Sequence, residues 1–421
     1  MTLREKATAV VLGGTVPHIA LLQRLRSRGY RTVVVDYLES PPAAEHADLH
    51  IKESTLDERA VLRVAESVEA DLVISACVDQ ANVTACYVGE KLNLPIPYSF
   101  QTALNVSRKP LMKRILTDAG VKTSRFAEVK SAAEIASTGL NYPIMVKPAD
   151  SCSSNAVKKA TSQRDAERFF EEARQASRTG SVLVEEFVDG HEVSVYAFAS
   201  DRDAKILLTA ERHTKIDGPS RTLKCYCTTA PARISEKVEK SILGILQKIA
   251  GSFGLTNTPI HLQVLIDGDD VNVIEFAPRV GGGLSYETIL RSTGFDIIEA
   301  TIDSYLGTPV VPLIKTSGAS FAICIIYGSS GEFNRIEGVE EVLREGLAEN
   351  FYQYKQPGAI IAEEKSSSSR LGAFVVRFEN FPNLWQKIAS ICTRIDAYDK
   401  AGNSILRRDI STASEITPFS D

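Results

Sequence analysis

Apolar and polar residues alternate most regularly in the stretch from Ile260 to Leu284. Leu262, Val264 and Ile266 occupy every second position in its first half, which is typical of a strand with one buried face. Turn-forming residues follow at Gly268–Asp270, and a second apolar run returns after them. The pattern therefore predicts a β-hairpin.

Two side chains with oxygen atoms lie on this predicted hairpin. Glu275 stands within the apolar return strand, and Gln263 lies across from it. A carboxylate in such a strand is costly unless another group pairs with it. Arg279 and the glycines Gly281–Gly283 follow. This set could hold a hard cation and an oxyanion, since Mg²⁺ takes one or two carboxylates together with substrate phosphates. The alternative is an edge hairpin with solvated polar residues.

The first hundred residues alternate between short apolar runs and amphipathic stretches. This alternation predicts an open parallel sheet with helices on both faces. The predicted strands are Ala9–Leu12, Thr32–Val35 and Asp71–Ser75, and the predicted helices are Pro17–Arg28, Asp57–Val68 and Gln80–Leu92.

A glycine turn at Gly13-Gly14-Thr15 links the first strand to the first helix, and Asp36 ends the second strand. An acid about 20 residues beyond a glycine turn is typical of dinucleotide-binding units. The turn reads GGTVPH, however, and not GxGxxG. The pattern therefore favours a structural turn over NAD binding.

Later segments carry helix and strand patterns of their own. The polar, irregular stretch Glu211–Pro231 is predicted to be a mobile loop. From Ala319 the pattern of apolar and polar residues changes, which indicates a further domain. The predicted elements of the middle region are helix Arg108–Ala119, strand Tyr142–Val146, helix Gln163–Arg178, strand Val182–Val184 and helix Ser235–Phe253.

Composition narrows the function classes. The 421 residues are 44% hydrophobic and 24% charged, which is ordinary for a globular protein. A net charge of −5 gives no basic field for nucleic acid, and no apolar run reaches the length of a membrane span. The seven cysteines are scattered. We therefore expect reduced thiols and a cytoplasmic protein that binds neither nucleic acid nor membrane.

Two stretches have the chemistry of a nucleotide site. Lys147 ends an apolar strand and precedes the small-residue loop Ser151–Asn155, whose N–H and hydroxyl groups suit phosphate oxygens. Downstream, the strand Val182–Val184 leads into EEFVDG, where backbone groups could meet a purine edge, and Glu192 could take ribose hydroxyls. The alternatives are a lysine that reaches solvent and an acidic turn.

Taken together, the order of these motifs resembles the ATP-grasp superfamily. The motifs are Lys109, PIMVKP, a small-residue loop, EEFVDGHE and Q…IEFAPR, and the likeness covers about residues 7–310. The resemblance implies an α/β protein in which an open parallel-sheet N-terminal domain precedes two α+β lobes that clamp ATP. The last third resembles the trailing α+β domain of carboxylate–amine ligases of the amino-acid type. The implied domains are residues 1–105, residues 106–315 with a lid lobe at about 120–190, and residues 316–421.

The resemblance also implies roles for individual residues, with ATP and Mg²⁺ as cofactors. Arg279 and Lys147 would be catalytic. Phosphate would contact Lys109, Lys147, Ser151, Ser153 and Ser154; adenine would contact Glu185, Glu186 and Val188; ribose would contact Glu192; Mg²⁺ would contact Gln263 and Glu275; and substrate would contact Arg279, Gly281, Gly282 and Gly283.

Three departures from the superfamily pattern keep other functions open. The phosphate loop Ser151–Asn155 contains no glycine, Gln263 replaces the usual acid, and Ala277 replaces the usual asparagine. The first hypothesis is an ATP-dependent ligase that activates a small carboxylate as an acyl phosphate and joins it to an amine. A bicarbonate-activating carboxylase of the same fold, a non-catalytic nucleotide-binding protein and an NAD dehydrogenase are the alternatives. Homodimers are common in the superfamily, but the sequence leaves the oligomeric state open.

Overall fold

The computed structural model describes residues 6–151, 156–201, 203–217, 222–362 and 369–411. The chain divides into two compact units. One comprises Met1–Thr209 and Ala232–Ser317, and the other comprises Ala210–Pro231 and Gly318–Asp421. In the part of the chain described, no helix is both long and apolar enough to cross a membrane.

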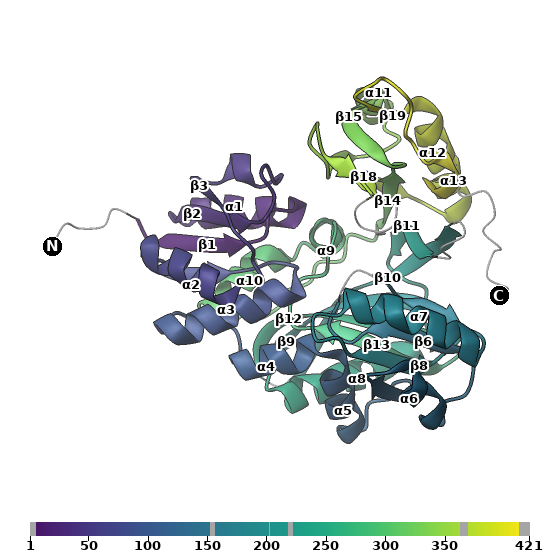
Figure 1. Ribbon diagram of the computed structural model, residues 1–421. Coiled ribbons are helices and arrows are strands. Elements are labelled where there is room, and N and C mark those ends of the chain that lie inside the picture. Colours follow the sequence, from purple (N-terminus) through teal and green to yellow (C-terminus); the bar gives the residue numbers. More distant parts are fainter. Residues whose placement is uncertain (1–5, 152–155, 202, 218–221, 363–368, 412–421) are drawn as a thin grey trace. The chain divides into compact units, whose positions relative to one another are not determined.

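The N-terminal part of the first unit is a parallel sheet, as the sequence predicts, but it has four strands, of which Leu49–Lys52 was not predicted. Its strands are β1 (Thr8–Leu12), β2 (Arg31–Asp36), β3 (Leu49–Lys52) and β4 (Leu72–Ile74), in the order β3-β2-β1-β4. Every residue of β1 is buried, as expected of a central strand covered on both faces. The covering helices are α1 (Val16–Ser27), α2 (Glu58–Ser67) and α3 (Asp79–Leu92), with α1 on the opposite face from α2 and α3 (Figure 1).

Local sequence explains where these helices begin. The side chain of Asp57 accepts hydrogen bonds from the backbone N–H groups of Arg59 and Ala60, which caps α2. Pro17 lies in the first turn of α1, where a missing N–H costs nothing. Gly29, with φ of 86°, follows α1, so the predicted helix is confirmed to within about a residue at each end.

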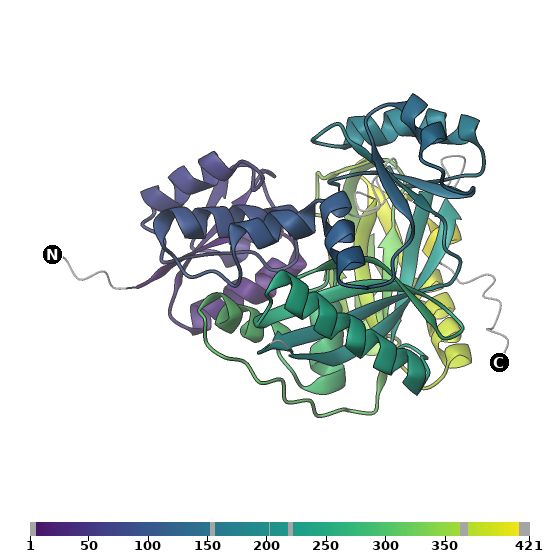
Figure 2. The same ribbon diagram turned by 90° about the horizontal axis from the view of Figure 1, so that it is seen from below.

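Two short helices, α4 (Phe100–Ser107) and α5 (Lys109–Asp118), lead into a second, antiparallel sheet. This sheet consists of β5 (Phe126–Val129), β6 (Ile144–Pro148), β7 (Lys158–Ala160) and β8 (Val182–Glu186), in the order β5-β8-β6-β7. Helices α6 (Ala132–Ser137) and α7 (Gln163–Ala176) pack together, and α7 lies on β6. The apolar core between them includes Ile144, Val146, Phe170 and Val184. This is the lobe predicted as the lid, and Figure 2 shows its helices on one side of the sheet.

The predicted hairpin forms the third sheet of this unit. Strands β12 (Asn257–Asp267) and β13 (Asp270–Ala277) pair antiparallel across a two-residue turn. The register places Gln263 opposite Glu275, as the sequence predicts. Strand β9 (His191–Ser200) pairs with the other edge of β12, and helix α8 (Glu236–Phe253) covers this sheet with a face that includes Ile242 and Leu246.

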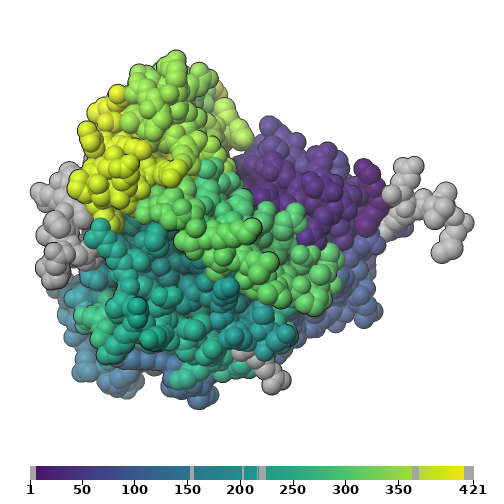
Figure 3. Space-filling model, turned by 180° about the vertical axis from the view of Figure 1, so that it is seen from behind, coloured from purple at the N-terminus to yellow at the C-terminus, as the bar shows by residue number. Residues whose placement is uncertain are grey.

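After the hairpin, α9 (Ser285–Thr293) and α10 (Ile297–Tyr305) lead to an extended segment that ends at Ser317. Figures 2 and 3 show this segment, in green, on the surface. The Asn257 side chain bonds the backbone of Thr308 and Val310. Hydrogen bonds between a side chain and the backbone therefore hold the segment, while its apolar side chains Val311 and Leu313 each remain 75% exposed.

The second unit is an α+β fold, as predicted. Its larger sheet pairs β11 (Thr222–Ala230) with β14 (Ser320–Tyr327), then β18 (Arg370–Phe378), then β16 (Asn350–Gln353). A smaller sheet has the order β17-β15-β19, formed by Ile360–Ile361, Gly331–Glu337 and Asp396–Asp399. The helices are α11 (Val339–Arg344), α12 (Phe381–Arg394) and α13 (Arg408–Ser411).

One sequence-based prediction is wrong here. The stretch Glu211–Pro231 was expected to be an irregular mobile loop, but its described residues form most of a β-hairpin. Strand β10 (Asp203–Asp217) extends into it and pairs antiparallel with β11. Polar residues such as Thr228 and Thr229 give β11 no clear strand pattern in the sequence. The strand forms because β11 also pairs with β14 and gains its stability from that pairing.

Candidate functional site

A cleft of about 410 Å³ in the first unit gathers many of the predicted site residues. Its walls come from the start of α3, from α4 and α5, and from the β12–β13 hairpin with the loop after it. The lining residues are Asp79, Gln80, Val106, Ser107, Lys109, Met112, Ser151, His261, Gln263, Glu275, Phe276, Ala277 and Arg279. Five of the positions predicted from sequence, namely Lys109, Ser151, Gln263, Glu275 and Arg279, therefore line one cavity.

Glu275 contributes its carboxylate to this cleft. Its Oε2 lies 3.3 Å from Nζ of Lys109. Burial opposes ionisation, but the charges of Lys109 and Lys147 outweigh burial and hold the pKa of Glu275 below its usual value. Nζ of Lys109 also donates to the carbonyl oxygen of Ser151 at 2.5 Å. The hairpin carboxylate, the first predicted phosphate lysine and the start of the small-residue loop are therefore in direct contact.

Gln263 joins the carboxylates of two neighbouring strands. Its Nε2 donates to Oε1 of Glu192 on β9 at 2.8 Å, and its Cα lies opposite that of Glu275 on β13. The predicted ribose ligand and the two predicted metal ligands thus stand on three adjacent strands. The hydrogen bond uses the amide nitrogen, so the amide oxygen of Gln263 is the atom left for a cation.

The oxygen donors of the hairpin suit magnesium only in combination with a substrate. Among the residues that the structure describes, no three His, Cys, Asp or Glu side chains are grouped so that they could hold a metal. One carboxylate and one amide oxygen fit Mg²⁺ that arrives with nucleotide phosphates, since this ion keeps part of its shell from phosphate and water. The donor set thus agrees with a nucleotide-bound Mg²⁺.

Arg279 is fixed by a residue that sequence reasoning missed. Its Nε and Nη2 donate to the two carboxylate oxygens of Asp79 at 2.7 and 2.8 Å, and its Nη1 donates to the carbonyl oxygen of Val280 at 2.7 Å. Burial would raise the pKa of Asp79, but Arg279 more than offsets it and lowers that pKa. Asp79 is the first residue of α3, which begins after the short loop that follows β4. The rule that ligands gather at the carboxyl ends of parallel strands could have pointed to it.

Lys147 is buried beside Glu185 rather than exposed. Its Nζ lies 2.7 Å from Oε1 of Glu185, while Oε2 of Glu185 lies 3.3 Å from Nζ of Lys113. Nζ of Lys113 also donates to Thr123 Oγ1 at 2.5 Å and to Ser124 Oγ at 3.1 Å. The carboxylate that was predicted to line adenine is therefore shared by two ammonium groups, and sequence reasoning gave Lys113 no role.

The charges in this cluster shift one another. Burial would raise the pKa of Glu185, but Lys113 and Lys147 more than offset it and the pKa is lowered. Burial lowers the pKa of Lys113 to about 8, against the opposing effect of Glu185. Within the described residues, Glu185 is the only hydrogen-bond or ion-pair partner of the Lys147 side chain, which leaves N–H groups of its ammonium for a ligand.

The other predicted nucleotide contacts are placed as follows. The carboxylate of Glu186 accepts from Arg125 and from the backbone and side chain of Asn141, at 2.8 to 2.9 Å. Val188, just past β8, makes no backbone hydrogen bond to another described residue, so its amide could meet a base edge. Ser153 and Ser154 lie outside the described residues.

The glycines after Arg279 differ in what they contribute. A Cβ on Gly281 would stand 2.5 Å from the ring of Tyr196, so packing requires glycine there. Gly283 has φ of 64°, in the left-handed region that glycine tolerates best. A Cβ on Gly282 would meet no atom within 4 Å. Space near Gly282 is therefore available to a ligand.

The backbone N–H groups of the glycine turn in the N-terminal sheet are hydrogen-bonded to other groups of the protein. Gly13 N–H bonds the carbonyl of Val35 at 2.9 Å, and Thr15 N–H bonds Nδ1 of His18 at 3.2 Å. The carboxylate of Asp36 accepts from Gly14. These bonds occupy the groups that would hold a pyrophosphate, which supports the structural interpretation of this turn.

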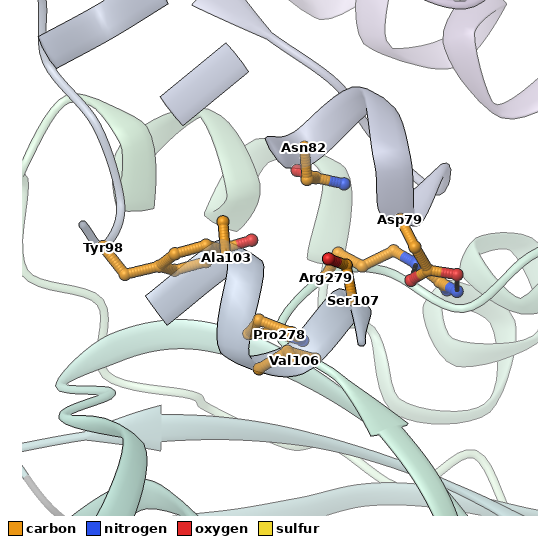
Figure 4. Close-up of a pocket in the computed structure, with 8 residues that line it drawn as sticks. All are labelled: Asp79, Asn82, Tyr98, Ala103, Val106, Ser107, Pro278 and Arg279. Carbon is orange, nitrogen blue, oxygen red and sulfur yellow. Dashed lines mark hydrogen bonds and ion pairs between the residues drawn. The ribbon is translucent and has the colours of Figure 1, made fainter. Parts of the chain in front are cut away.

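A second, smaller pocket of about 230 Å³ adjoins the cleft. It is lined by Asp79, Asn82, Tyr98, Ala103, Val106, Ser107, Pro278 and Arg279. Figure 4 shows the side chains of Asp79 and Arg279 facing each other at one end and Tyr98 at the other. The Asp79–Arg279 pair therefore borders both cavities.

Residues 140–287 match the ATP-grasp domain family. The chain is 24% identical over 324 residues to the formate-dependent phosphoribosylglycinamide formyltransferase of Synechococcus sp. strain CC9311, which covers 75% of this chain and 80% of the relative.

Two solved structures share the fold. L-amino acid ligase from Bacillus licheniformis superposes with a TM-score of 0.77 and 20% identity, over 94% of this chain and all of that one. N5-carboxyaminoimidazole synthetase from Staphylococcus aureus, solved with ADP, gives a TM-score of 0.71 and 19% identity, over 92% of this chain and 98% of that one. The fold predicted from the order of motifs is therefore confirmed.

Proposed function

We propose that this chain, whose residues 140–287 match the ATP-grasp domain family, is an ATP-dependent carboxylate–amine ligase. One carboxylate oxygen of the substrate would attack the γ-phosphorus of ATP, which forms an acyl phosphate and releases ADP. The amine would then attack the acyl carbon and displace inorganic phosphate. The products are an amide, ADP and phosphate.

The observation that carries the proposal is the convergence of Lys109, Gln263, Glu275 and Arg279 on one cleft. Phosphoryl transfer needs positioned positive charge around the transferred group and little covalent chemistry from the protein. Lys109 and Lys147 would hold the phosphates, and Arg279 would stabilise charge on the transferred phosphoryl group. Gln263 and Glu275 would hold Mg²⁺, which neutralises phosphate charge when it is bound. Val188 would contact adenine.

The N-terminal sheet and the glycines after Arg279 would supply the substrate side of the site. Asp79 reaches the cleft from the N-terminal sheet, and Gly282 has open space at its Cα. We accordingly assign residues 1–105 to substrate binding and residues 106–315, apart from the Ala210–Pro231 segment that belongs to the second unit, to the grasp domain. A carboxylate and an amine of small size suit these two neighbouring cavities.

A bicarbonate-activating carboxylase is the second candidate. The motif Glu275-Phe276-Ala277-Pro278-Arg279 favours it, because this motif resembles the EIAPR form of carboxyaminoimidazole-synthase-like members of the superfamily. Bicarbonate would take the place of the organic carboxylate, and the first step would be the same. The two candidates differ in which acid is activated.

The test is ADP release by the purified full chain with MgATP. Carboxylic acids, formate and amino acids are supplied with and without amines, and bicarbonate is supplied in a separate series. For an acid that supports turnover, ¹⁸O in its carboxylate should appear in the released phosphate, because the acyl phosphate keeps the attacking oxygen. ADP release that requires bicarbonate instead would favour the carboxylase. AMP as the product, or ATP binding without any turnover, would contradict both candidates.

A further inference from the structure

We propose that Asp79 is a positioning residue that fixes the guanidinium of Arg279 for the phosphoryl group. This inference rests on the proposed function and adds a residue from the N-terminal sheet to its site. Asp79 lies 200 positions before Arg279 in the chain. No motif on which the family resemblance rests includes Asp79.

The contact is a two-point fork. Both carboxylate oxygens of Asp79 accept from Arg279, on Nε and on Nη2. Two parallel bonds define the plane and direction of a guanidinium, which a single contact would leave free to rotate. The side chains are only 12% exposed for Arg279 and 27% exposed for Asp79, so water competes weakly for the same bonds.

Asp79 is held as an anion by its place in the fold. It is the first residue of the 14-residue helix α3, and the positive end of a helix macrodipole favours a carboxylate there. Lys109 and His261 add to the effect of Arg279 in lowering its pKa. The carboxylate therefore stays charged across the neutral range and keeps its fork with Arg279.

The fork leaves part of the guanidinium for a ligand. An arginine has five N–H groups. Two are donated to Asp79 and one to Val280, and these are the hydrogen bonds of the guanidinium within the described residues. Two N–H groups of Arg279, which lines the cleft, thus remain for an oxyanion.

The backbone on both sides of this arginine is packed, since Pro278, Val280 and Gly281 are buried. That packing fixes the start of the Arg279 side chain and not its far end. Apart from the bond of Nη1 to Val280, the hydrogen bonds that hold the guanidinium within the described residues come from Asp79. The carboxylate at the start of α3 is a rigid support, because the packing of the whole helix α3 fixes the position of its first residue.

The first experiment compares Asp79→Asn and Asp79→Glu with wild type in ADP release. Asparagine keeps the shape but removes the charge and one acceptor, so kcat should fall by about 10- to 100-fold, the range typical when a partner behind a functional side chain is lost. KM for ATP should change by less than about threefold, since the lysines still hold the phosphates. Glutamate should recover part of kcat.

The matched control is Asp296→Asn. Asp296 also accepts two bonds from an arginine, Nε and Nη2 of Arg24, at 2.9 and 2.8 Å, and it lines neither cavity. Its loss should lower the melting temperature without lowering kcat. If Asp79→Asn and Asp296→Asn lowered kcat by the same factor, the pair at Arg279 would be a structural tie and the proposal would be wrong.

Chemical rescue separates positioning from stability. Guanidinium ion added to Arg279→Ala should restore part of the turnover, because Asp79 would hold the ion where the side chain was. The double variant Arg279→Ala/Asp79→Asn should not be rescued. Equal rescue in the single and double variants would overturn the proposal.

A spectroscopic readout does not depend on turnover. In protein labelled with ¹⁵N-arginine, the Nε–H signal of Arg279, identified by its absence in Arg279→Lys, should exchange slowly with water and should broaden or shift in Asp79→Asn. An unchanged signal would overturn the positioning role even if the wild type released no ADP. Absence of ADP release alone, with the expected broadening or shift of this signal in Asp79→Asn, would count against the ligase and leave the positioning of Arg279 supported.

Discussion

Two buried ion-pair clusters in the first unit contain the same kinds of side chains and differ in what surrounds them. The Asp79–Arg279 pair borders two cavities. The Lys113–Glu185 pair borders neither of them, and its side chains are 0% and 5% exposed. Arg279 keeps two N–H groups for a ligand, whereas the ammonium of Lys113 faces Thr123, Ser124 and Glu185.

This difference shows that burial of a charge is a poor guide to chemistry. A buried pair costs desolvation wherever it stands, and its net contribution to stability is small or uncertain. A buried charged side chain is a candidate for binding a ligand when it lines a cavity and has N–H groups that no protein group accepts. Lys147 lies between the two cases, because it shares Glu185 with Lys113 yet has no other described partner.

The largest effect should come from Glu275→Gln in the cleft. The substitution is nearly isosteric and removes the only carboxylate assigned to Mg²⁺, so turnover should fall by about 100-fold or more, as when other preorganised charges are removed. The measurement is turnover against Mg²⁺ concentration, with circular dichroism to confirm the fold. Gln263→Glu, which adds an acid, should keep activity. Wild-type turnover by Glu275→Gln at saturating Mg²⁺ would show that the metal is held elsewhere.

Substitution of the two lysines that share Glu185 should have different effects, one on ATP binding and the other on the stability of the fold. Lys147→Ala should weaken ATP binding by about 10- to 100-fold, the worth of a charge-assisted phosphate contact. Lys113→Met should instead destabilise the fold by about 3 kcal/mol, the cost of breaking a buried pair, with ATP affinity much less changed. Calorimetric titration with ATP and urea unfolding measure the two quantities. The reverse pattern would mean that Lys113 is the phosphate ligand.

A pH series should sharpen the contrast at Lys113. Burial lowers its pKa from 10.5 to about 8 in the folded protein, so between about pH 8 and 10.5 the unfolded chain binds more protons than the folded one. The contribution of this group to the free energy of unfolding therefore rises with pH across that window. The difference in unfolding free energy between wild type and Lys113→Met should grow from pH 7.5 to pH 9.5. A constant difference would show that Lys113 has an ordinary pKa.

The smallest effect on activity should come from Asp36→Ala. Its carboxylate accepts from the backbone of Leu38 and Gly14 and lines neither cavity. The variant should lose some stability, while turnover stays within about twofold, as for substitutions remote from a site. Thermal unfolding and ADP release measure both. A large loss of turnover, together with NAD binding by the wild type, would revive the dehydrogenase hypothesis.

Sequence alone determined the local elements, and the turn at Gly268 predicted that the two strands of the hairpin pair with each other. That turn pairs Asp267 with Asp270, a register that would set Gln263 opposite Ile274. A β-bulge between Gln263 and Val264 shifts the register and brings Gln263 opposite Glu275. The order of motifs also led to the fold and to five residues of the cleft. In these cases the interacting groups are near in sequence, or the pattern is shared across a superfamily.

Only the tertiary structure decided which charges meet. Asp79 and Arg279 stand 200 positions apart, and the lysines at Glu185 come from α5 and β6. The strand in Glu211–Pro231 likewise depends on β14, about a hundred residues later. Side-chain periodicity reports which face of an element is buried, but it carries no information on the partner that buries it. That partner follows from the path of the whole chain, because contacts between distant segments form only when the packed elements bring them together.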